Sequence, residues 1–539
     1  PSAGGNHYGI HSQVAKPTGY AGYFLGRVAI GTTAANNYIL PLTRGTANQI
    51  MQTDGSGNVT WQNPNTVLNN FAWTTTGNSG TNPSTNFIGT TDNNPLQIRV
   101  NNEKSGQIDH LLYNTFFGYQ SGSSVTTGLF NTANGSNALQ NNTTGSSNTA
   151  IGTNALRNTT TGGSNTAVGM GALLNNLTGF SNTASGKDAL RSNTTGISNT
   201  AAGRNSLYDN TTGSFNTANG DSALTNNTTG TGNTANGTNT LYSNTTGYGN
   251  TANGMSALQN NTIGNFNIGI GNEALRTKTS GSNNLAVGNG ALYSSSTPSF
   301  NVALGNNALY YNSTGENNLA IGVQALYSNL TSSNNIAIGN SVLFANTLGF
   351  RNIGIGAQSL TDNVSGSYNI ALGNSTLKDN TSGDENVAIG DFTLQLNTTG
   401  ENNTSVGTRS LFYNTTGYSN TALGFNALFA NTTGTGNVGI GFSSVVNNTS
   451  GVRNIGIGPS SMYSNTTGND NIAIGTGTLH ENIIGSKNIV IGYEAGYNET
   501  GSNKLYIENS NSTTPLIYGE FDTDILRAHT QRFFVNDPT

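Results

Sequence analysis

Four carboxylates stand in two close pairs whose spacing would suit acid–base chemistry. Asp384 adjoins Glu385, and Asp522 lies two residues before Asp524. A glycosidase holds two carboxyl groups about 5–10 Å apart across the bond that it cleaves. Parallel β-helices can carry such sites, so a glycan-acting enzyme is one alternative. No recurring acidic ladder supports such a site, however, and we expect that the chain is not an enzyme.

Other patterns that could bind a cofactor or a metal are weak. Gly434, Gly436 and Gly439 match the spacing of a dinucleotide fingerprint, which works only between a strand and a helix. Here the three glycines straddle a turn and the strand that follows it. The chain has no cysteine and only five scattered histidines. We therefore expect no catalytic residue, no bound cofactor and no metal site.

Aromatic residues form a more regular pattern, because they recur at multiples of 17 residues. Flat rings bind sugars or another protein chain, and aromatic residues are enriched in oligomer interfaces. We expect this column to pack between subunits, with ligand contact as the alternative. Its members are Tyr208, Tyr242, Tyr293, Tyr310, Tyr327, Phe344, Phe412 and Phe429.

The same period of 17 runs through most of the chain. Asn occupies all 23 positions spaced by 17 from Asn114 to Asn488, and Gly follows four residues after each one. We call each repeat a rung and count its positions from this asparagine as position 0. Position 8 is leucine in 18 successive rungs, and position 14 is nearly always glycine after Asn-Thr-Thr. Representative column residues are Asn165, Gly169, Leu173, Asn335, Gly339 and Leu343.

A 17-residue unit is too short for paired helices and suits one turn of a parallel β-solenoid. We expect a strand at positions 1 to 3, a glycine bend, a second short strand centred on the leucine, and an Asn-Thr-Thr-Gly turn. Stacked at about 4.8 Å, 23 rungs would make a rod of roughly 110 Å. Many turns also read Asn-x-Thr, as at Asn142, Asn193 and Asn227, which turn chemistry explains without glycosylation.

Positions 1 and 3 change character along the chain. Position 1 is threonine from Thr132 to Thr251, then mostly Ile, Leu or Val from Ile268. Position 3 carries Asn219, Asn236 and Asn253 in succession, whose amides we expect to hydrogen-bond along the axis. An ice-binding solenoid is a second alternative, although ice-binding faces use two parallel threonine files. The apolar burial in such a narrow core compensates for little of the conformational entropy that the chain loses on folding. We therefore expect three copies to associate and to bury a second face.

Composition excludes several classes of protein. Only 8% of residues are charged and 33% hydrophobic, and glycine makes up 72 of 539, which is unlike ordinary globular domains. The net charge of −5 and the absence of a basic run argue against nucleic-acid binding. No stretch approaches the roughly 20 apolar residues of a membrane span.

The Asn-Ile-Ala-Ile-Gly strands at 335–339 and 471–475 resemble the head repeats of trimeric autotransporter adhesins. That resemblance implies a left-handed parallel β-roll with three chains around one axis. Five further motifs are similar to phage-type tail-fibre proteins of Bacteroidetes. They are Gly31-Thr-Thr, Leu40-Pro-Leu-Thr-Arg-Gly, Gln52-Thr-Asp-Gly, Phe87-Ile-Gly-Thr-Thr-Asp-Asn and Asn114-Thr-Phe-Phe-Gly-Tyr-Gln.

These observations predict an all-β homotrimeric fibre with small β modules at both ends. The expected divisions are 1–62 and 63–112 for two N-terminal modules, 113–500 for the solenoid, and 501–539 for a cap or joint. Val28 to Gly31 looks like a lone rung strand, and Phe533, Phe534 and Val535 lie in the tail. We expect a structural fibre or adhesin, outside the cell, on a cell surface or on a phage-like particle. Its expected partners are copies of itself, in a homotrimer or an end-to-end filament, and a cell-surface glycan or receptor.

Overall fold

The computed structural model describes residues 28–33, 36–64, 73 and 77–530, in two compact units divided between Asn94 and Pro95. The first unit holds two antiparallel hairpins. One joins β1 (Ala29–Thr33) to β2 (Asn36–Ile39), and the other joins β3 (Ile50–Thr53) to β4 (Val59–Gln62). The predicted lone rung strand at Val28 to Gly31 is therefore wrong, because most of it forms one arm of a hairpin.

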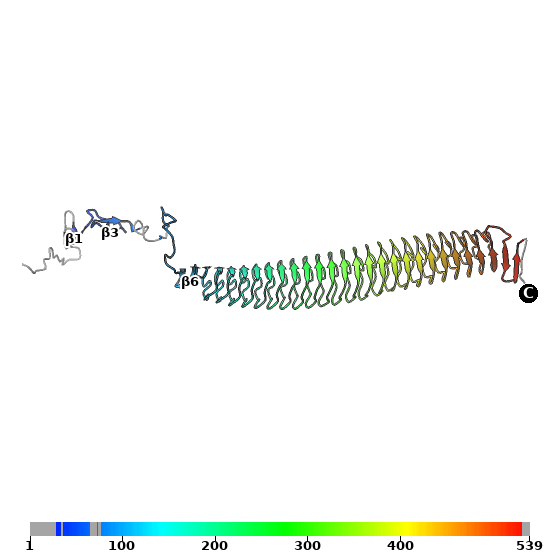
Figure 1. The fold of residues 1–539 in the computed structure, drawn as a ribbon, viewed down its shortest axis with the longest axis horizontal. Helices are drawn as coiled ribbons and strands as arrows, with labels where there is room; N and C mark the ends of the chain where they lie inside the picture. Colours follow the sequence, from blue (N-terminus) through cyan, green and yellow to red (C-terminus); the bar gives the residue numbers. More distant parts are fainter. Residues whose placement is uncertain (1–27, 34–35, 65–72, 74–76, 531–539) are drawn as a thin grey trace, which may run out of the picture. The chain divides into compact units, whose positions relative to one another are not determined.

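The second unit is a parallel β-solenoid, and every element assigned in it is a strand (Figure 1). Each strand from β7 to β28 hydrogen-bonds in parallel register to the strand 17 residues later, as Thr217 to Thr234, and β29 pairs in parallel with β30 at a spacing of 16 residues. This confirms the predicted 17-residue rungs. The strands are β5 (Leu96–Val100), β6 (Glu103–Asp109), β7 (Asn114–Phe117), β8 (Thr132–Asn134), β9 (Thr149–Ile151), β10 (Thr166–Val168), β11 (Thr183–Ser185), β12 (Thr200–Ala202), β13 (Thr217–Asn219), β14 (Thr234–Asn236), β15 (Thr251–Asn253), β16 (Ile268–Ile270), β17 (Leu285–Val287), β18 (Val302–Leu304), β19 (Leu319–Ile321), β20 (Ile336–Ile338), β21 (Ile353–Ile355), β22 (Ile370–Leu372), β23 (Val387–Ile389), β24 (Thr404–Val406), β25 (Thr421–Leu423), β26 (Val438–Ile440), β27 (Ile455–Ile457), β28 (Ile472–Ile474), β29 (Ile489–Ile491), β30 (Lys504–Ile507), β31 (Ile517–Glu520) and β32 (Ile525–Ala528).

Each rung contains one strand, so the predicted second strand around the leucine is wrong. Leu173 and Leu343 both have φ of 52°, in the left-handed region, and lie within a run of tight turns. A bulky residue in this conformation is uncommon, because its Cβ crowds the backbone. Burial compensates here, since both leucine side chains are fully buried. The leucine column fills the core from a turn.

The core of each rung is narrow. Ala167 at position 2, Ala172 at position 7 and Leu173 at position 8 are fully buried, and the same three positions supply most of the buried apolar side chains in the other rungs. Small alanines let the strand approach the turn that carries the leucine. Stacking repeats this set along the axis, so each rung covers the apolar atoms of its neighbours.

Two columns of buried asparagines run beside this core. At position 0, Asn182 is fully buried. Its backbone N donates to Asn165 Oδ1 at 3.0 Å, and its Nδ2 donates to Gly196 O at 2.8 Å. Asn335 repeats both contacts, with Asn318 Oδ1 and Gly349 O. At position 11, Asn193 Nδ2 donates to Asn176 Oδ1 at 2.8 Å. Each amide thus joins consecutive rungs or closes the turn within its own rung.

Glycine at position 4 is required by both conformation and space. Gly169 and Gly339 have φ of 137° and 133°, which side chains rarely adopt. A Cβ built on Gly220 would lie 2.5 Å from Gly237 O in the next rung. The column therefore tolerates only glycine at the spacing of the stacked rungs.

Antiparallel strands terminate the solenoid at both ends. The β5–β6 hairpin pairs with β7, and β31 and β32 follow β30, which is the last parallel strand. The segments Leu505-Tyr-Ile and Leu516-Ile-Tyr contribute to β30 and β31. At the other end, β5 pairs with β6, and β6 pairs with the strand of the first rung, β7. The predicted tail residues Phe533, Phe534 and Val535 lie outside the described residues.

Candidate functional site: the outer faces of the solenoid

The outer side of the parallel sheet, formed by positions 1 and 3, is the largest regular surface; we call it the sheet face. In the 14 rungs from β16 to β29, position 3 is always Ile, Val or Leu. Position 1 is also aliphatic there, apart from Thr404 and Thr421. These side chains alternate with the buried position 2, and they stay partly or fully exposed, as with Ile355 at 39% and Leu423 at 47%.

This apolar part of the sheet face is large for a surface without a partner. Fourteen rungs at about 4.8 Å span roughly 65 Å. Two side-chain columns about 10 Å wide then give an area of the order of 650 Å², whereas the largest apolar patch of a monomer is typically about 300–600 Å². Neither position carries a charged residue in any rung. Such a surface is typical of an interface.

The N-terminal part of the sheet face is polar. From β8 to β15, position 1 is threonine throughout, while position 3 varies among Asn, Ser, Ala, Ile and Val. The expected amide ladder of Asn219, Asn236 and Asn253 does not form, because no hydrogen bond links these three described side chains; the ladders run through positions 0 and 11 instead. The threonines make a single file, which is half of the two-file pattern expected of an ice-binding face.

The aromatic column at position 9 lies on another face, next to the leucine turn. Tyr293, Tyr310, Tyr327 and Phe344 stack ring on ring at 4.9, 5.3 and 5.1 Å between centroids. Tyr311 at position 10 packs edge-on against two of these rings. Partial burial raises the pKa of the Tyr310 hydroxyl.

Ring stacking limits what the aromatic column can bind. Inner rings cover each other's faces, so they present edges and hydroxyls outward, whereas a sugar packs on an open ring face. Phe412 and Phe429 form a second, shorter stack at 5.5 Å. Tyr208 and Tyr242 stand in separate parts of the column, and Arg191 lies over the Tyr208 ring. All eight predicted residues are half-buried.

Sequence analysis missed one segment of this column. Tyr463, His480 and Tyr497 occupy position 9 in three successive rungs and stack at 4.9 and 4.5 Å. The signal was present, because all three keep the 17-residue spacing. The histidine interrupts the Tyr and Phe pattern that defined the column.

The two predicted carboxylate pairs lie in separate turns of the chain. Asp384 accepts a hydrogen bond from Ser367 N at 2.6 Å, and both residues occupy position 15 in successive rungs. Asp522 and Asp524 are exposed in the hairpin turn between β31 and β32. Glu401 occupies the position of Asp384 in the next rung, where Asn402 N donates to Asp384 O at 3.0 Å.

The glycine fingerprint and the glycosylation motifs have structural roles. Gly436 closes a turn with φ of 65°, and Gly439 lies inside β26, followed by another rung and not by a helix. Asn142, Asn193 and Asn227 are fully buried at position 11. The folded shaft therefore cannot offer these amides to a glycosylating enzyme. Among the described residues, no group of three or more His, Asp or Glu is placed to hold a metal ion.

Lys278 is the one basic side chain inside the position 11 column of the described shaft. It is fully buried, and its Nζ donates to Pro298 O at 2.9 Å. Desolvation lowers the pKa of this ammonium group to about 7. Ser295, the next residue of the column, has a buried Oγ without a hydrogen-bond partner. The asparagine ladder is thus interrupted over two rungs.

No family model, curated protein or solved structure matches this chain. In the part of the chain that the structure describes, no helix has the length and apolarity to cross a bilayer.

Proposed function

We propose that this chain is the shaft of a non-catalytic fibre that self-associates side by side and gives reach, rigidity and attachment to a surface or receptor. The observation that carries the proposal is the apolar part of the sheet face, on β16 to β29. Burying about 650 Å² per copy approaches the roughly 800 Å² per partner of a standard interface. At about 25 cal/mol per Å², that burial is worth of the order of 15 kcal/mol per copy before association costs.

A second copy of the same chain is the partner that fits this surface best. Its aliphatic columns repeat at the same rise, so two parallel copies in register set apolar rungs against apolar rungs. The same register sets the Thr and Asn rungs, such as Thr217 and Asn219, against their polar equivalents. A shifted register would bury polar side chains against Ile and Val at a cost.

We further propose three copies around one axis, in the left-handed sense that the adhesin resemblance implies. Location outside the cell, on a cell surface or on a phage-like particle rests on the same resemblance and on that to tail fibres. Rigidity is supported by the buried asparagine ladder at position 0, which hydrogen-bonds each rung to the next, and by the interrupted ladder at position 11. The antiparallel strands at both ends favour a shaft of fixed length over end-to-end growth.

The solution mass of the purified chain, measured by light scattering at several concentrations, tests the proposal. A mass near three times 55.7 kDa supports the trimeric fibre. A mass of 55.7 kDa at every concentration would leave the sheet face unpartnered and would overturn self-association.

A further inference from the structure

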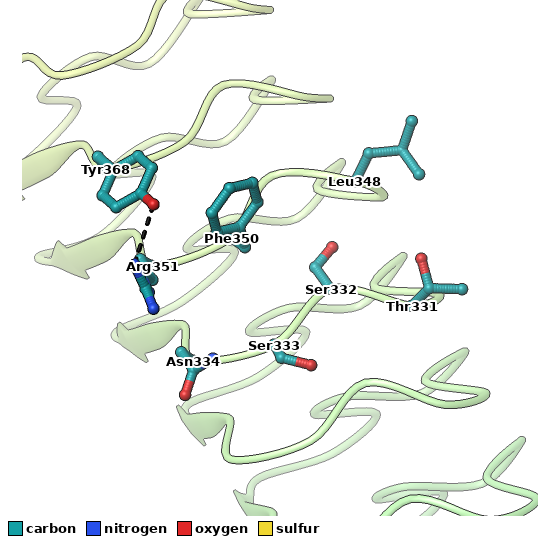
Figure 2. Close-up of a pocket in the computed structure, with 8 residues that line it drawn as sticks. All are labelled: Thr331, Ser332, Ser333, Asn334, Leu348, Phe350, Arg351 and Tyr368. Atoms are coloured by element: carbon teal, nitrogen blue, oxygen red, sulfur yellow. Dashed lines mark hydrogen bonds between the residues drawn. The ribbon is translucent and has the colours of Figure 1, made fainter.

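An open hollow of about 360 Å³ lies on the turn side of three successive rungs (Figure 2). Phe350, Arg351 and Tyr368 line one side of it. The other residues of the hollow are Thr331, Ser332, Ser333, Asn334 and Leu348. Figure 2 shows the hydroxyl of Tyr368 directed at Arg351, with the ring of Phe350 beside them. The hollow therefore combines a cation, an aromatic ring and several hydroxyl and amide groups.

The guanidinium of Arg351 is held in place without a carboxylate. Its Nη1 donates to Tyr368 Oη at 2.9 Å, and the group lies 5.4 Å from the centre of the Tyr368 ring. Its backbone N donates to Ser333 O at 3.2 Å. No carboxylate of the described residues forms an ion pair with it. Arg351 is thus ordered by its neighbours while its remaining N–H donors stay available.

Arg453 provides an internal comparison, because it occupies the same position 16 six rungs later. There the next residue of the column is Asp470, which binds the guanidinium through two hydrogen bonds of 2.7 and 3.0 Å. In the rung after Arg351 the corresponding residue is Tyr368. Arginine in this column therefore has the geometry for a bidentate interaction with a carboxylate. At Arg351 the next rung offers Tyr368 and no carboxylate in that place.

The rest of the hollow suits a sugar ring. Phe350 is 40% exposed and meets Tyr368 edge-on at 5.1 Å, so it is not covered within a parallel stack. Ser333 Oγ accepts from Glu316 N at 3.0 Å and keeps its own proton to donate. Asn334 adds an amide from the same rung. An aromatic platform beside hydroxyl and amide groups is how proteins hold the apolar face and the hydroxyls of a pyranose.

We propose that this hollow binds a sugar residue that carries a carboxylate, such as a uronic acid unit of an acidic polysaccharide. The carboxylate pairs with Arg351, and the ring packs on Phe350. The inference deepens the attachment role proposed above and rests on it by naming the ligand class. It does not depend on how many copies associate.

Isothermal titration of the full chain with the tetrasaccharide of galacturonic acid tests the proposal. The neutral galactose tetrasaccharide and acetate are titrated in parallel. We expect the acidic tetrasaccharide to bind at least about tenfold more tightly than either, which is about 1.4 kcal/mol. Arg351→Asn should remove that preference, and Phe350→Ser should weaken binding of the acidic sugar. Asn and Ser occur at these positions in other rungs, as Asn334 and Ser333, so both variants are expected to fold.

Arg453→Asn is the matched control. It removes an arginine from the same column, but one whose guanidinium is already bound by the Asp470 carboxylate. It should bind like the unmodified chain. Equal binding of the acidic and neutral sugars, no binding of either, acetate binding as tightly as the acidic sugar, or an unchanged Arg351→Asn variant would each overturn the site. The solution mass is read on the same samples, so a trimer without sugar binding refutes this site alone.

Discussion

Asn261 Oδ1 has no hydrogen-bond donor, because Lys278 stands one rung later where an asparagine amide would reach it. Before this point in the position 11 column, Asn261 itself donates to Asn244 Oδ1 at 2.8 Å, and the same contact links successive asparagines back to Asn176. The interruption falls in the rung of β16, where the sheet face changes from polar to apolar. The shaft therefore has a weaker junction between its two parts.

Lys278→Asn should restore the ladder and stabilise the shaft. The new amide can donate to Asn261 Oδ1, and the cost of burying a lysine disappears. At pH 6 the gain from removing the lysine with the depressed pKa should be about 5 kcal/mol at most. Differential scanning calorimetry of both chains measures it. An unchanged or lower melting temperature would contradict the assigned role of Lys278.

The same lysine predicts a pH dependence. Its pKa is about 7 in the folded shaft and about 10.4 when unfolded, so between these values the unfolded chain binds more protons. Stability should therefore rise as the pH increases from 7 to about 10, and the burial cost should be greatest below pH 7. Melting temperatures across this range should rise more in the original chain than in Lys278→Asn. Parallel curves would count against the prediction.

Asn193→Ala should destabilise the shaft, because it removes hydrogen bonds between buried groups. Asn176 Oδ1 would lose its donor, Gly196 O would lose one of its two donors, and Asn210 Nδ2 would lose one of its two acceptors. Each unsatisfied group costs about 1–3 kcal/mol. The exposed Thr195→Ala, two residues later, should stay within about 0.5 kcal/mol of the original chain. Chemical denaturation of the two variants makes the comparison, and equal effects would refute the ladder's role.

Gly220→Ala should prevent regular stacking at one rung. The new Cβ would meet Gly237 O at 2.5 Å, at a backbone φ of 143°. Gly232→Asn is the control, since its φ of 65° suits asparagine and no atom lies closer than 4.0 Å. Hydrogen exchange should show faster amide exchange around Gly220 in the first variant only. Protection that survives Gly220→Ala would show that the rungs can separate without loss of order.

Much of the fold follows from the sequence because the period is strict. Asn165 and Gly169 recur without exception, and that register alone predicts parallel rungs. The conformation of Leu173 could not be predicted, because leucine rarely adopts positive φ and only the packed turn explains it. The amide ladder was assigned to Asn219 and its successors, although the buried asparagines at positions 0 and 11 form it. Asn219 is the exposed last residue of β13, whereas the asparagines at positions 0 and 11 of that rung lie buried outside the strand.

For the candidate surfaces, the sequence predicts which residues share a column but not how their side chains are oriented. The change from Thr251 to Ile268 is visible in the sequence. That both residues lie on one exposed face follows only from the structure, in which positions 1 and 3 of each strand are exposed or half-buried and position 2 is buried. The spacing placed Tyr293, Tyr310 and Tyr327 in one column, whereas their ring-on-ring stacking emerges only from the structure. The pairing of Arg351 with Tyr368 did not, because it depends on side-chain orientation at position 16.

The central claim is that the apolar part of the sheet face holds the copies together. Its most direct test is the light-scattering mass of two double variants that place lysines at position 3. Ile355→Lys with Ile389→Lys charges the apolar part, whereas Asn219→Lys with Asn253→Lys charges the polar part. We predict that the first variant falls to the 55.7 kDa of one chain while the second keeps the mass of the assembly. An assembly that survives the first variant and is lost in the second would contradict the claim.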